Sequence, residues 1–415
     1  MSLDKGNFFG FSPVPKGLKS VYIRLDLKSE LCLLNTSSLS PSAPYPLYSM
    51  SANRVLVAMS GGVDSSVTAA LLHQQGYEVI GITMKTWDYA QSGGNGKKET
   101  GCCSLDSIND ARQMAVEMGF PHYIIDIRDE FGDWVIDNFV EEYLAGRTPN
   151  PCVLCNTKIK WEALLRRADS MDCDWIATGH YAQVREVNGQ YVISRGVDDH
   201  KDQSYVLWGV SQDCLRRTMF PVGGYRKEEI RQMCLDFGFE SLSKKGDSYE
   251  ICFVPDNDYR GFLRRRKPEA LAELAGGQLV STSGEVVGQH DGFPFYTIGQ
   301  RKGLPAFGEP RYVVDLDPDT NTVVIGGKED LLNRRMLVRG VNLQKYTELP
   351  EDGMPAVTKI RYKDPGTPSW IRPLPDGEME VIFETPVSAI TPGQSAVFYE
   401  EDDVIGGGWI RNAGE

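Results

Sequence analysis

From Asn53 onward, short apolar runs alternate with longer segments whose apolar residues recur at helical spacing. Continuous apolar runs of this length are typical of strands that are buried on both faces of a sheet. Strands are predicted at Arg54–Met59, Glu78–Met84, His122–Ile127 and Trp175–Thr178. Helices are predicted at Ser65–Gln75, Leu105–Met118, Glu130–Leu144 and Ile159–Ser170. The alternation predicts an α/β fold, a Rossmann-like parallel sheet covered by helices on both faces, with ligands beyond the carboxyl ends of its strands.

The pattern changes in the second half of the chain. The pair Asn188-Gly189, between two alternating segments, predicts a β-hairpin. The stretch from Cys214 to Leu242 is helical in pattern and more charged, so we place the start of a second domain near Phe220. After Gly277 the helical period disappears, and short alternating segments between turns predict a terminal β-barrel. These segments are Tyr312–Leu316, Thr322–Ile325, Glu378–Phe383 and Ser395–Tyr399.

We therefore expect four parts along the 415 residues. Residues 1–52 form an extension that we expect to be poorly ordered, because its Ser- and Pro-rich end is typical of a linker. The parallel α/β domain takes residues 53–218, a small central domain takes 219–310, and a C-terminal β-barrel domain takes 311–415.

The composition is that of a globular protein, with 41% hydrophobic and 24% charged residues. No apolar run approaches the roughly 18–20 residues that span a bilayer, so we expect no membrane association. The nine cysteines lack the spacing of a disulfide-stapled domain, which favours a reducing, cytoplasmic compartment. The net charge of −13 by itself argues against a nucleic-acid partner, but local basic runs such as Arg264-Arg265-Arg266-Lys267 keep one open.

The segment Ser60-Gly61-Gly62-Val63-Asp64-Ser65-Ser66 joins the first predicted strand to the first predicted helix. A tight Gly-Gly turn lets backbone N–H groups approach a phosphate, and the helix N-terminus adds partial positive charge. The segment lacks the G-x-x-x-x-G-K-[ST] spacing of the loop that grips β- and γ-phosphates. It resembles instead the PP-loop signature of ATP pyrophosphatases, the adenine nucleotide alpha-hydrolase-like fold. That resemblance implies attack on the α-phosphorus of ATP, with Mg²⁺ neutralising phosphate charge.

Cys152 and Cys155 form a C-x-x-C pair just before a helix predicted to run from Lys158. Thiols near the positive end of a helix have a lowered pKa and more thiolate. The pair is consistent with half a zinc site, a redox pair, or a nucleophile with a neighbour. Structural zinc needs two further ligands at comparable spacing, and no second C-x-x-C occurs, so we expect no zinc. Cys252, between a polar turn and an apolar run, taken by itself is typical of a small buried hydrophobic residue.

Several motifs occur together and in one order. They read SGGVDS, AGRTPNPC-x-x-CN, ATGHY, KDQSY, FPVG and ICF, followed by YTIGQRKGL and TPGQ. Together they closely resemble the tRNA-specific 2-thiouridylase family. The resemblance runs from about Asn53 to Gly408, and so covers nearly everything except the first fifty residues.

The resemblance implies the role of each matching residue. The ATP site corresponds to Ala58, Met59, Ser60, Gly61, Gly62, Val63, Asp64 and Ser65, with Met84 and Gly179. Cys155 matches the nucleophilic cysteine, and Cys252 matches the cysteine that carries a persulfide. The segment that contacts the target base corresponds to Asn150, Pro151 and Cys152. Contacts to tRNA correspond to His180, Lys201, Asp202, Gln203, Arg361, Tyr362 and Gln394.

The implied reaction is ATP-dependent 2-thiolation of the wobble uridine of tRNA. ATP adenylates the C2 oxygen, sulfur from the Cys252 persulfide replaces that oxygen, and Cys155 releases the sulfur with formation of a Cys155–Cys252 disulfide. AMP and pyrophosphate leave. The expected partners are tRNA and a protein that donates persulfide sulfur, and we expect a monomer. One departure matters, because some members of the family carry an aspartate where this chain has Cys152, so a carboxylate role cannot be transferred to that position.

Two alternatives stay open. An amidating synthetase would use the same loop with a small-molecule acceptor, but it leaves Cys155 and Cys252 without a role. A metal- or cluster-binding RNA module would bring Cys152, Cys155 and Cys252 together on an iron–sulfur cluster with one open iron site.

Overall fold

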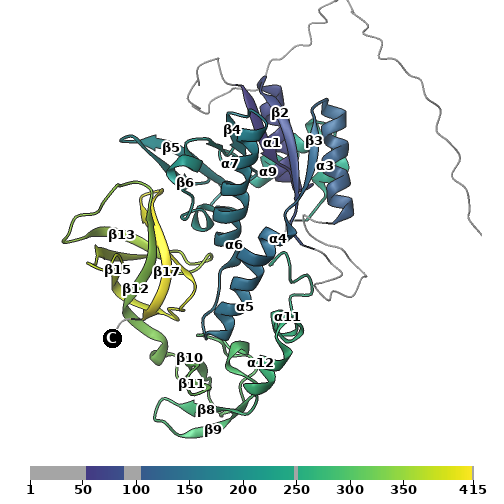
Figure 1. Cartoon of the computed structure of the whole chain (residues 1–415). Helices are drawn as coiled ribbons and strands as arrows, with labels where there is room; N and C mark the ends of the chain where they lie inside the picture. The colour runs from purple at the N-terminus through teal and green to yellow at the C-terminus, as the bar shows by residue number, and fades with distance from the viewer. Residues whose placement is uncertain (1–52, 88–103, 247–250, 414–415) are drawn as a thin grey trace, which may run out of the picture. The chain divides into compact units, whose positions relative to one another are not determined.

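The computed structural model of the protein describes residues 53–87, 104–246 and 251–413 (Figure 1). The predicted extension 1–52 lies outside these residues.

A five-stranded parallel sheet forms the first folded part, in the order β3-β2-β1-β4-β7. Its strands are β1 (Arg54–Ala58), β2 (Glu78–Lys85), β3 (His122–Asp126), β4 (Trp175–Ala177) and β7 (Thr218–Met219). The four predicted strands are therefore confirmed to within a residue. The fifth strand escaped prediction because two residues are too few to show a period.

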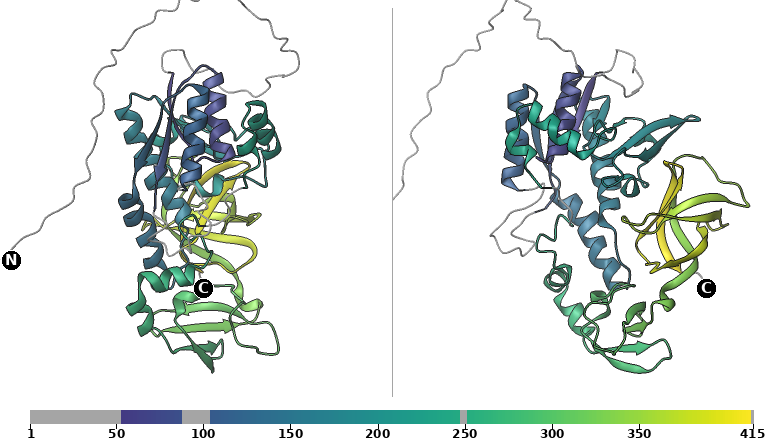
Figure 2. Two further views of the ribbon diagram at one scale, coloured as in Figure 1. Left: turned by 90° about the vertical axis from the view of Figure 1, so that its right-hand side faces the viewer. Right: turned by 180° about the vertical axis from the view of Figure 1, so that it is seen from behind.

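Helices cover both faces of this sheet (Figures 1 and 2). The helices are α1 (Val63–Gln74), α3 (Leu105–Met118) and α9 (Lys227–Asp236) on one face, with α10 (Glu240–Ser243) following α9. Val55 and Val57 of β1 pack toward these helices, whereas Leu56 packs toward the opposite cluster with Trp161 and Leu164. Successive strand side chains point to opposite faces, so burial on both sides produces the continuous apolar run.

The two remaining predicted helices begin earlier than their periodicity suggests. The first is made of α4 (Arg128–Phe131), a π-helical segment (Gly132–Ile136) and α5 (Asp137–Leu144). The second is made of α6 (Pro151–Leu154), a π-helical segment (Cys155–Ala163) and α7 (Leu164–Ser170). Its start at Pro151 corrects the predicted start at Ile159. Proline suits the first helical turn, where its missing N–H costs nothing, so the C-x-x-C pair lies inside the helix.

A hairpin leads from the sheet toward the barrel. It consists of β5 (Ala182–Val187) and β6 (Gln190–Arg195), and the turn at Asn188-Gly189 has positive φ at both residues, which confirms the predicted hairpin. Ser194 of β6 pairs with Asp403 of the barrel strand β17. Two short helical segments follow, a 3₁₀ turn (Ser204–Val206) and α8 (Gln212–Leu215).

A second, four-stranded sheet occupies the middle of the chain, in the order β10-β11-β8-β9. Its strands are β8 (Gly277–Ser281), β9 (Val286–His290), β10 (Tyr312–Asp317) and β11 (Thr322–Gly326), and it follows α11 (Tyr259–Arg266) and α12 (Pro268–Glu273). Two short 3₁₀ turns lie at Phe293–Phe295 and Glu329–Leu331. The assignment of β10 and β11 to the terminal barrel was wrong, because alternation identifies a strand but not the sheet it joins.

The last six strands close into a barrel (Figure 2). They are β12 (Leu332–Leu343), β13 (Met354–Lys359), β14 (Thr367–Pro373), β15 (Met379–Ser388), β16 (Ser395–Glu400) and β17 (Asp403–Ala413). Closure follows because β12 pairs with both β15 and β17. Its interior is filled by apolar side chains such as Met336, Phe383 and Phe398, which confirms a C-terminal β-barrel.

Candidate functional site

The Gly-rich loop lies at the carboxyl end of β1 and is shaped by two close backbone contacts. Gly61 has a φ of +70°, in the left-handed region, and a Cβ there would lie 1.9 Å from the backbone oxygen of Ser107 in α3. A Cβ on Gly179, which follows β4, would lie 2.7 Å from the backbone nitrogen of Ser65. Glycine is therefore required at both positions for the loop, α3 and the end of β4 to meet.

Serine hydroxyls hold the loop in shape. The Ser60 N–H donates to Ser65 Oγ at 3.1 Å, the two hydroxyl oxygens are 3.2 Å apart, and the Ser65 hydroxyl donates to the Gly62 carbonyl at 3.2 Å. Strand pairing brings the other predicted nucleotide residues to this edge. Ala58 pairs with Ile82, so Met84 lies just beyond on β2, and Gly179 follows the Ala177 partner of Val57.

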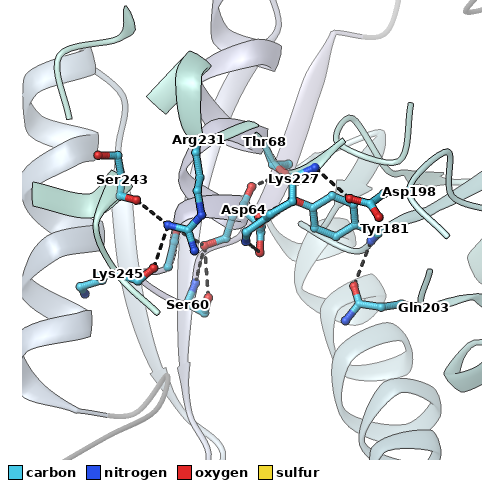
Figure 3. Close-up of polar contacts among 12 residues, drawn as sticks. Ser60, Asp64, Thr68, Tyr181, Asp198, Gln203, Lys227, Arg231, Ser243 and Lys245 are labelled. Atoms are coloured by element: carbon cyan, nitrogen blue, oxygen red, sulfur yellow. Dashed lines mark hydrogen bonds and ion pairs between the residues drawn. The ribbon is translucent and has the colours of Figure 1, made fainter. Parts of the chain in front are cut away.

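Asp64, in the first turn of α1, has two partners from distant segments (Figure 3). Lys227 Nζ donates to both carboxylate oxygens, at 2.7 and 2.9 Å, and the Tyr181 hydroxyl donates to Oδ1 at 2.7 Å. Lys227 is almost fully buried, and its backbone N–H donates to Asp198 at 3.0 Å. Lys227 was not identified from the sequence. A lysine at the start of a helix has no neighbouring residues that indicate an ion pair with Asp64, which is distant in sequence.

A second lysine reaches the loop from beyond α10. Lys245 Nζ donates to the Gly61 carbonyl at 2.9 Å and forms an ion pair with Asp110 of α3. Arg231 of α9 donates to the Lys245 carbonyl at 2.9 Å, so the cationic segment is tied to the helix (Figure 3). The loop thus has positive charge beside its backbone N–H groups, which suits a phosphate.

The C-x-x-C pair lies in the first turns of the helix from Pro151. The Cys155 N–H donates to the backbone oxygens of Cys152 and Pro151. The Cys152 residue is exposed, but protein atoms around its thiol desolvate it and raise its pKa, which Lys160 only partly offsets. The prediction of a lowered thiol pKa was wrong for Cys152, because desolvation outweighs the field of the helix end.

Cys155 and Cys252 approach the same part of the molecule from distant segments. Both are partly buried and pack against one hydrophobic cluster, and Met84 of β2 packs against it as well. The cluster is built around Phe131, Phe139, Ile159, Phe253 and Phe262. The structure therefore places both cysteines against the same hydrophobic cluster as Met84, a residue of the predicted ATP site.

The predicted tRNA-contacting residues fall into a buried set and an exposed set. His180 is buried, its Nδ1 lies 2.7 Å from Thr178 Oγ1, and burial together with Lys160 lowers its pKa well below the usual value. Asp202 is also buried and accepts from the N–H groups of Gly196 and Ser204, at 3.1 Å each. These side chains satisfy internal groups.

The other predicted contacts differ in exposure. The Gln203 side chain accepts from the Tyr181 N–H at 2.9 Å (Figure 3). Lys201 is partly exposed. Arg361 and Tyr362 are exposed on the turn after β13. Gln394 Nε2 donates to the carbonyls of Thr148 and Pro149, at 3.0 and 3.1 Å. Gln394 thus ties the barrel to the segment that precedes Asn150.

A cavity of about 250 Å³ opens at this junction. Pro149, Asn150 and Leu154 line it from the helix start, and Arg339 and Trp409 line it from the barrel. It presents apolar rings beside a guanidinium and amide groups, a mixture suited to a nucleobase. Asn150 belongs both to this cavity and to the predicted target-base segment.

Two further properties concern the part of the chain that the structure describes. No three His, Cys, Asp or Glu side chains there are grouped so that they could hold a metal ion. None of the helices at 53–87, 104–246 or 251–413 has the length and apolar character needed to cross a bilayer.

Comparison with known proteins places the chain. Residues 53–256 match a family model described as tRNA methyl transferase HUP domain, residues 262–327 its PRC-barrel domain, and residues 335–410 an aminomethyltransferase beta-barrel domain. The tRNA-specific 2-thiouridylase MnmA of Cytophaga hutchinsonii is 62% identical over 87% of this chain and 98% of that protein. The proteins of the same name from Amoebophilus asiaticus and Salinibacter ruber are 60% and 57% identical, each over 87% of this chain.

A solved structure titled as a 4-thiouridine synthetase–RNA complex with bound ATP is only distantly similar, with 15% identity and a TM-score of 0.32 over 52% of this chain and 51% of that one. The parallel sheet and its glycine loop define a nucleotide-binding protein of the PP-loop ATP pyrophosphatase class. Within that class, the chain belongs to the tRNA-specific 2-thiouridylase family.

Proposed function

We propose that this protein uses ATP to replace the C2 oxygen of the wobble uridine of tRNA with sulfur. The observation that carries the proposal is the convergence of Cys155, Cys252 and Met84 on one hydrophobic cluster. A small-molecule amidating synthetase needs the nucleotide edge but not two cysteines beside it. The labels of the domain models mention methyl transfer, whereas the relatives that cover most of the chain have the thiouridylase name.

The loop supplies the first step. Backbone N–H groups at Gly61 and Gly62, with Lys245 beside them, would hold the phosphates of ATP, which enters with its Mg²⁺ as a substrate complex. Asp64 already has Lys227 as its counterion, so we expect the phosphates to hold most of the Mg²⁺ coordination. The uracil O2 then attacks the α-phosphorus, pyrophosphate leaves, and the base oxygen becomes part of an AMP leaving group.

The cysteines supply the second step. We propose that Cys252 arrives as a persulfide, loaded by a sulfur-donor protein, and that its terminal sulfur is delivered to C2 as AMP departs. Cys155 attacks the inner sulfur of the Cys252 persulfide and forms a Cys155–Cys252 disulfide. The outer sulfur stays on C2 and is reduced by the two electrons that the cysteine pair loses. Two thiols, or one dithiol, must then reduce the disulfide, which suits the reducing cytoplasm that we expect for this chain. The base must leave its stack to reach the loop.

Cys152 has a different role in this scheme from the aspartate that some members of the family carry at this position. Its thiol stays protonated near neutral pH, because desolvation by the protein atoms around it raises its pKa. It therefore cannot serve as the base that an ionised aspartate would provide. We assign Cys152, with Asn150 and Pro151, to contact with the target base.

The decisive experiment replaces Cys252 with Ser and follows two steps separately. We expect 2-thiouridine in tRNA to fall at least about 100-fold, because the variant has no thiol to carry the persulfide, while tRNA-dependent ATP–pyrophosphate exchange persists. Mass spectrometry of digested tRNA measures the first, and exchange of labelled pyrophosphate measures the second.

The matched control is Cys173→Ser. Cys173 is buried just before β4 in a different hydrophobic cluster from Cys252, and its thiol donates to the Met171 carbonyl, a bond that serine can keep. Normal thiolation by Cys252→Ser would exclude the persulfide route.

An anaerobic iron count decides the iron–sulfur alternative. That alternative fails if fully active protein holds far less than one cluster per chain.

A further inference from the structure

Two cationic side chains lie over the same buried aromatic ring, where the β5–β6 hairpin meets the barrel. Arg195, the last residue of β6, has its guanidinium carbon 4.6 Å from the centroid of the Tyr399 ring. Lys359, the last residue of β13, has its Nζ 5.4 Å from the same centroid. Tyr399 itself is fully buried and its hydroxyl lies 3.0 Å from Ser204 Oγ.

Neither cation is neutralised by a bonded partner. Within the described residues, no hydrogen bond or ion pair of the Lys359 amine is found, and Arg195 Nε is buried without an acceptor. Burial and the nearby Arg195 charge both lower the pKa of Lys359. Two like charges that are partly desolvated repel one another, so the pair is costly unless an anion joins it.

The nearby carboxylates do not fill that role. Asp202 accepts hydrogen bonds from Gly196 and Ser204, and Asp364 accepts from the backbone N–H groups of Ile360 and Gly366. Asp199, which also acts electrostatically on Lys359, is exposed. The carboxylates of Asp202 and Asp364 thus stabilise turns. Both attract the Lys359 amine electrostatically, but neither forms an ion pair with it.

The surroundings favour a polynucleotide over a small anion. Arg361 and Tyr362 are exposed two and three residues after Lys359, and the Tyr362 ring lies 6.2 Å from that of Tyr205 in an edge-on arrangement. An exposed aromatic ring and a guanidinium beside a cationic pair match the sugar, base and phosphate groups of a nucleotide chain.

We propose that Arg195 and Lys359 together bind one backbone phosphate of the RNA substrate at the seam between hairpin and barrel. The proposal rests on the proposed function, since it takes tRNA as the ligand. It adds a phosphate site distinct from the Gly-rich loop, formed where β6 and β13 end. Binding a phosphate there would relieve the repulsion and orient the RNA without reading its sequence.

The test measures tRNA affinity of the full chain against salt concentration. For Lys359→Gln and Arg195→Gln we expect weaker binding, by about three- to tenfold at low salt, and a slope of log K against log[salt] that is shallower by roughly one, because one phosphate contact is lost. Lys359→Arg should restore the slope. Lys244→Gln is the matched control, since Lys244 is an exposed lysine paired with Glu240 on α10.

The outcomes separate the two proposals. An unchanged slope in both Gln variants, with normal thiolation, overturns the phosphate site and leaves the proposed function standing. Failure of the wild-type chain to bind tRNA overturns both. Inorganic phosphate is titrated in parallel, and if it binds the wild type but not the variants while their tRNA slopes stay unchanged, the site serves a free anion and the RNA proposal fails. Thermal unfolding of each variant shows whether the fold is kept.

Discussion

Buried polar side chains give this site much of its character at the scale of single residues. His180 lies between Thr178 and Lys160, where burial and a neighbouring positive charge both oppose protonation. The Asp64 carboxylate, by contrast, accepts hydrogen bonds from the Lys227 amine and the Tyr181 hydroxyl. Both residues were expected to contact ligands, and both are held first by partners inside the protein. Their side chains therefore have defined positions before any ligand arrives.

The neutral state of His180 predicts a pH dependence of stability. An unfolded histidine has a pKa near 6.5, whereas burial lowers the pKa of His180, so below about pH 6.5 the unfolded chain binds a proton that the folded chain does not. The free energy of unfolding should therefore decrease as the pH falls below about 6.5, and His180 should account for about 1.4 kcal/mol per pH unit of that decrease. Urea unfolding between roughly pH 7.5 and 5.5 should show a shallower loss for His180→Gln than for the wild type.

The control for this prediction is the exposed His200, whose replacement by Gln should leave the pH dependence unchanged. Part of the acid loss should survive in His180→Gln, because burial also lowers the pKa of His122 and His290. Identical curves for wild type and His180→Gln would show that folding does not lower the pKa of His180.

At the scale of elements, the turn between β1 and α1 depends on how closely α3 approaches it. Gly61 combines a left-handed φ with a backbone oxygen where a Cβ would be. Gly76, at the other end of α1, has a φ of +88° but nothing within 4 Å of its Cβ position. The two glycines therefore separate the cost of backbone conformation from the cost of a steric clash.

We expect Gly61→Ala to weaken ATP binding at least tenfold and to destabilise the fold by more than about 2 kcal/mol, because α3 must move as well. Gly76→Ala should cost only about 1–2 kcal/mol, the price of a left-handed alanine, with ATP affinity unchanged. Equilibrium binding of ATP and urea unfolding check both. Equal effects of the two substitutions would argue against close packing of α3 on the loop.

At the scale of the whole molecule, the barrel contacts the parallel-sheet domain through the segment before Asn150. Gln394 donates to the Thr148 and Pro149 carbonyls, and the Thr148 N–H donates to the Pro392 carbonyl at 2.8 Å. A Cβ on Gly393 would lie 2.9 Å from the Thr148 carbonyl oxygen. This contact holds the wall of the cavity beside Asn150.

Removing that contact should affect the RNA step and spare the nucleotide step. For Gln394→Ala we expect thiolation kcat/KM to fall about ten- to a hundredfold, because two hydrogen bonds worth roughly 1 kcal/mol each position the segment that we propose contacts the target base. ATP affinity should stay within about twofold. Gln113→Ala, at an exposed position on α3, is the control. A parallel loss of ATP affinity would mean that the barrel supports the nucleotide site as well.

Much of the fold was predictable where the relevant signal is local. The strand and helix periods, the hairpin at Asn188-Gly189 and the loop with its glycine pair all depend on residues close in sequence. The helix start at Pro151 was missed because the apolar period begins only later. The sheet joined by β10 and β11 was missed because strand pairing is decided by partners far along the chain.

By itself, the sequence determined the parallel α/β domain, the Gly-rich turn between β1 and α1, and the order of motifs that marks the family, because each depends on short runs of residues. Tertiary structure alone decided that Lys227 neutralises Asp64, that Cys155 and Cys252 share one hydrophobic cluster, and that Arg195 and Lys359 meet at Tyr399. Those pairs are distant in sequence, and their meeting depends on how whole elements pack, which no local pattern encodes.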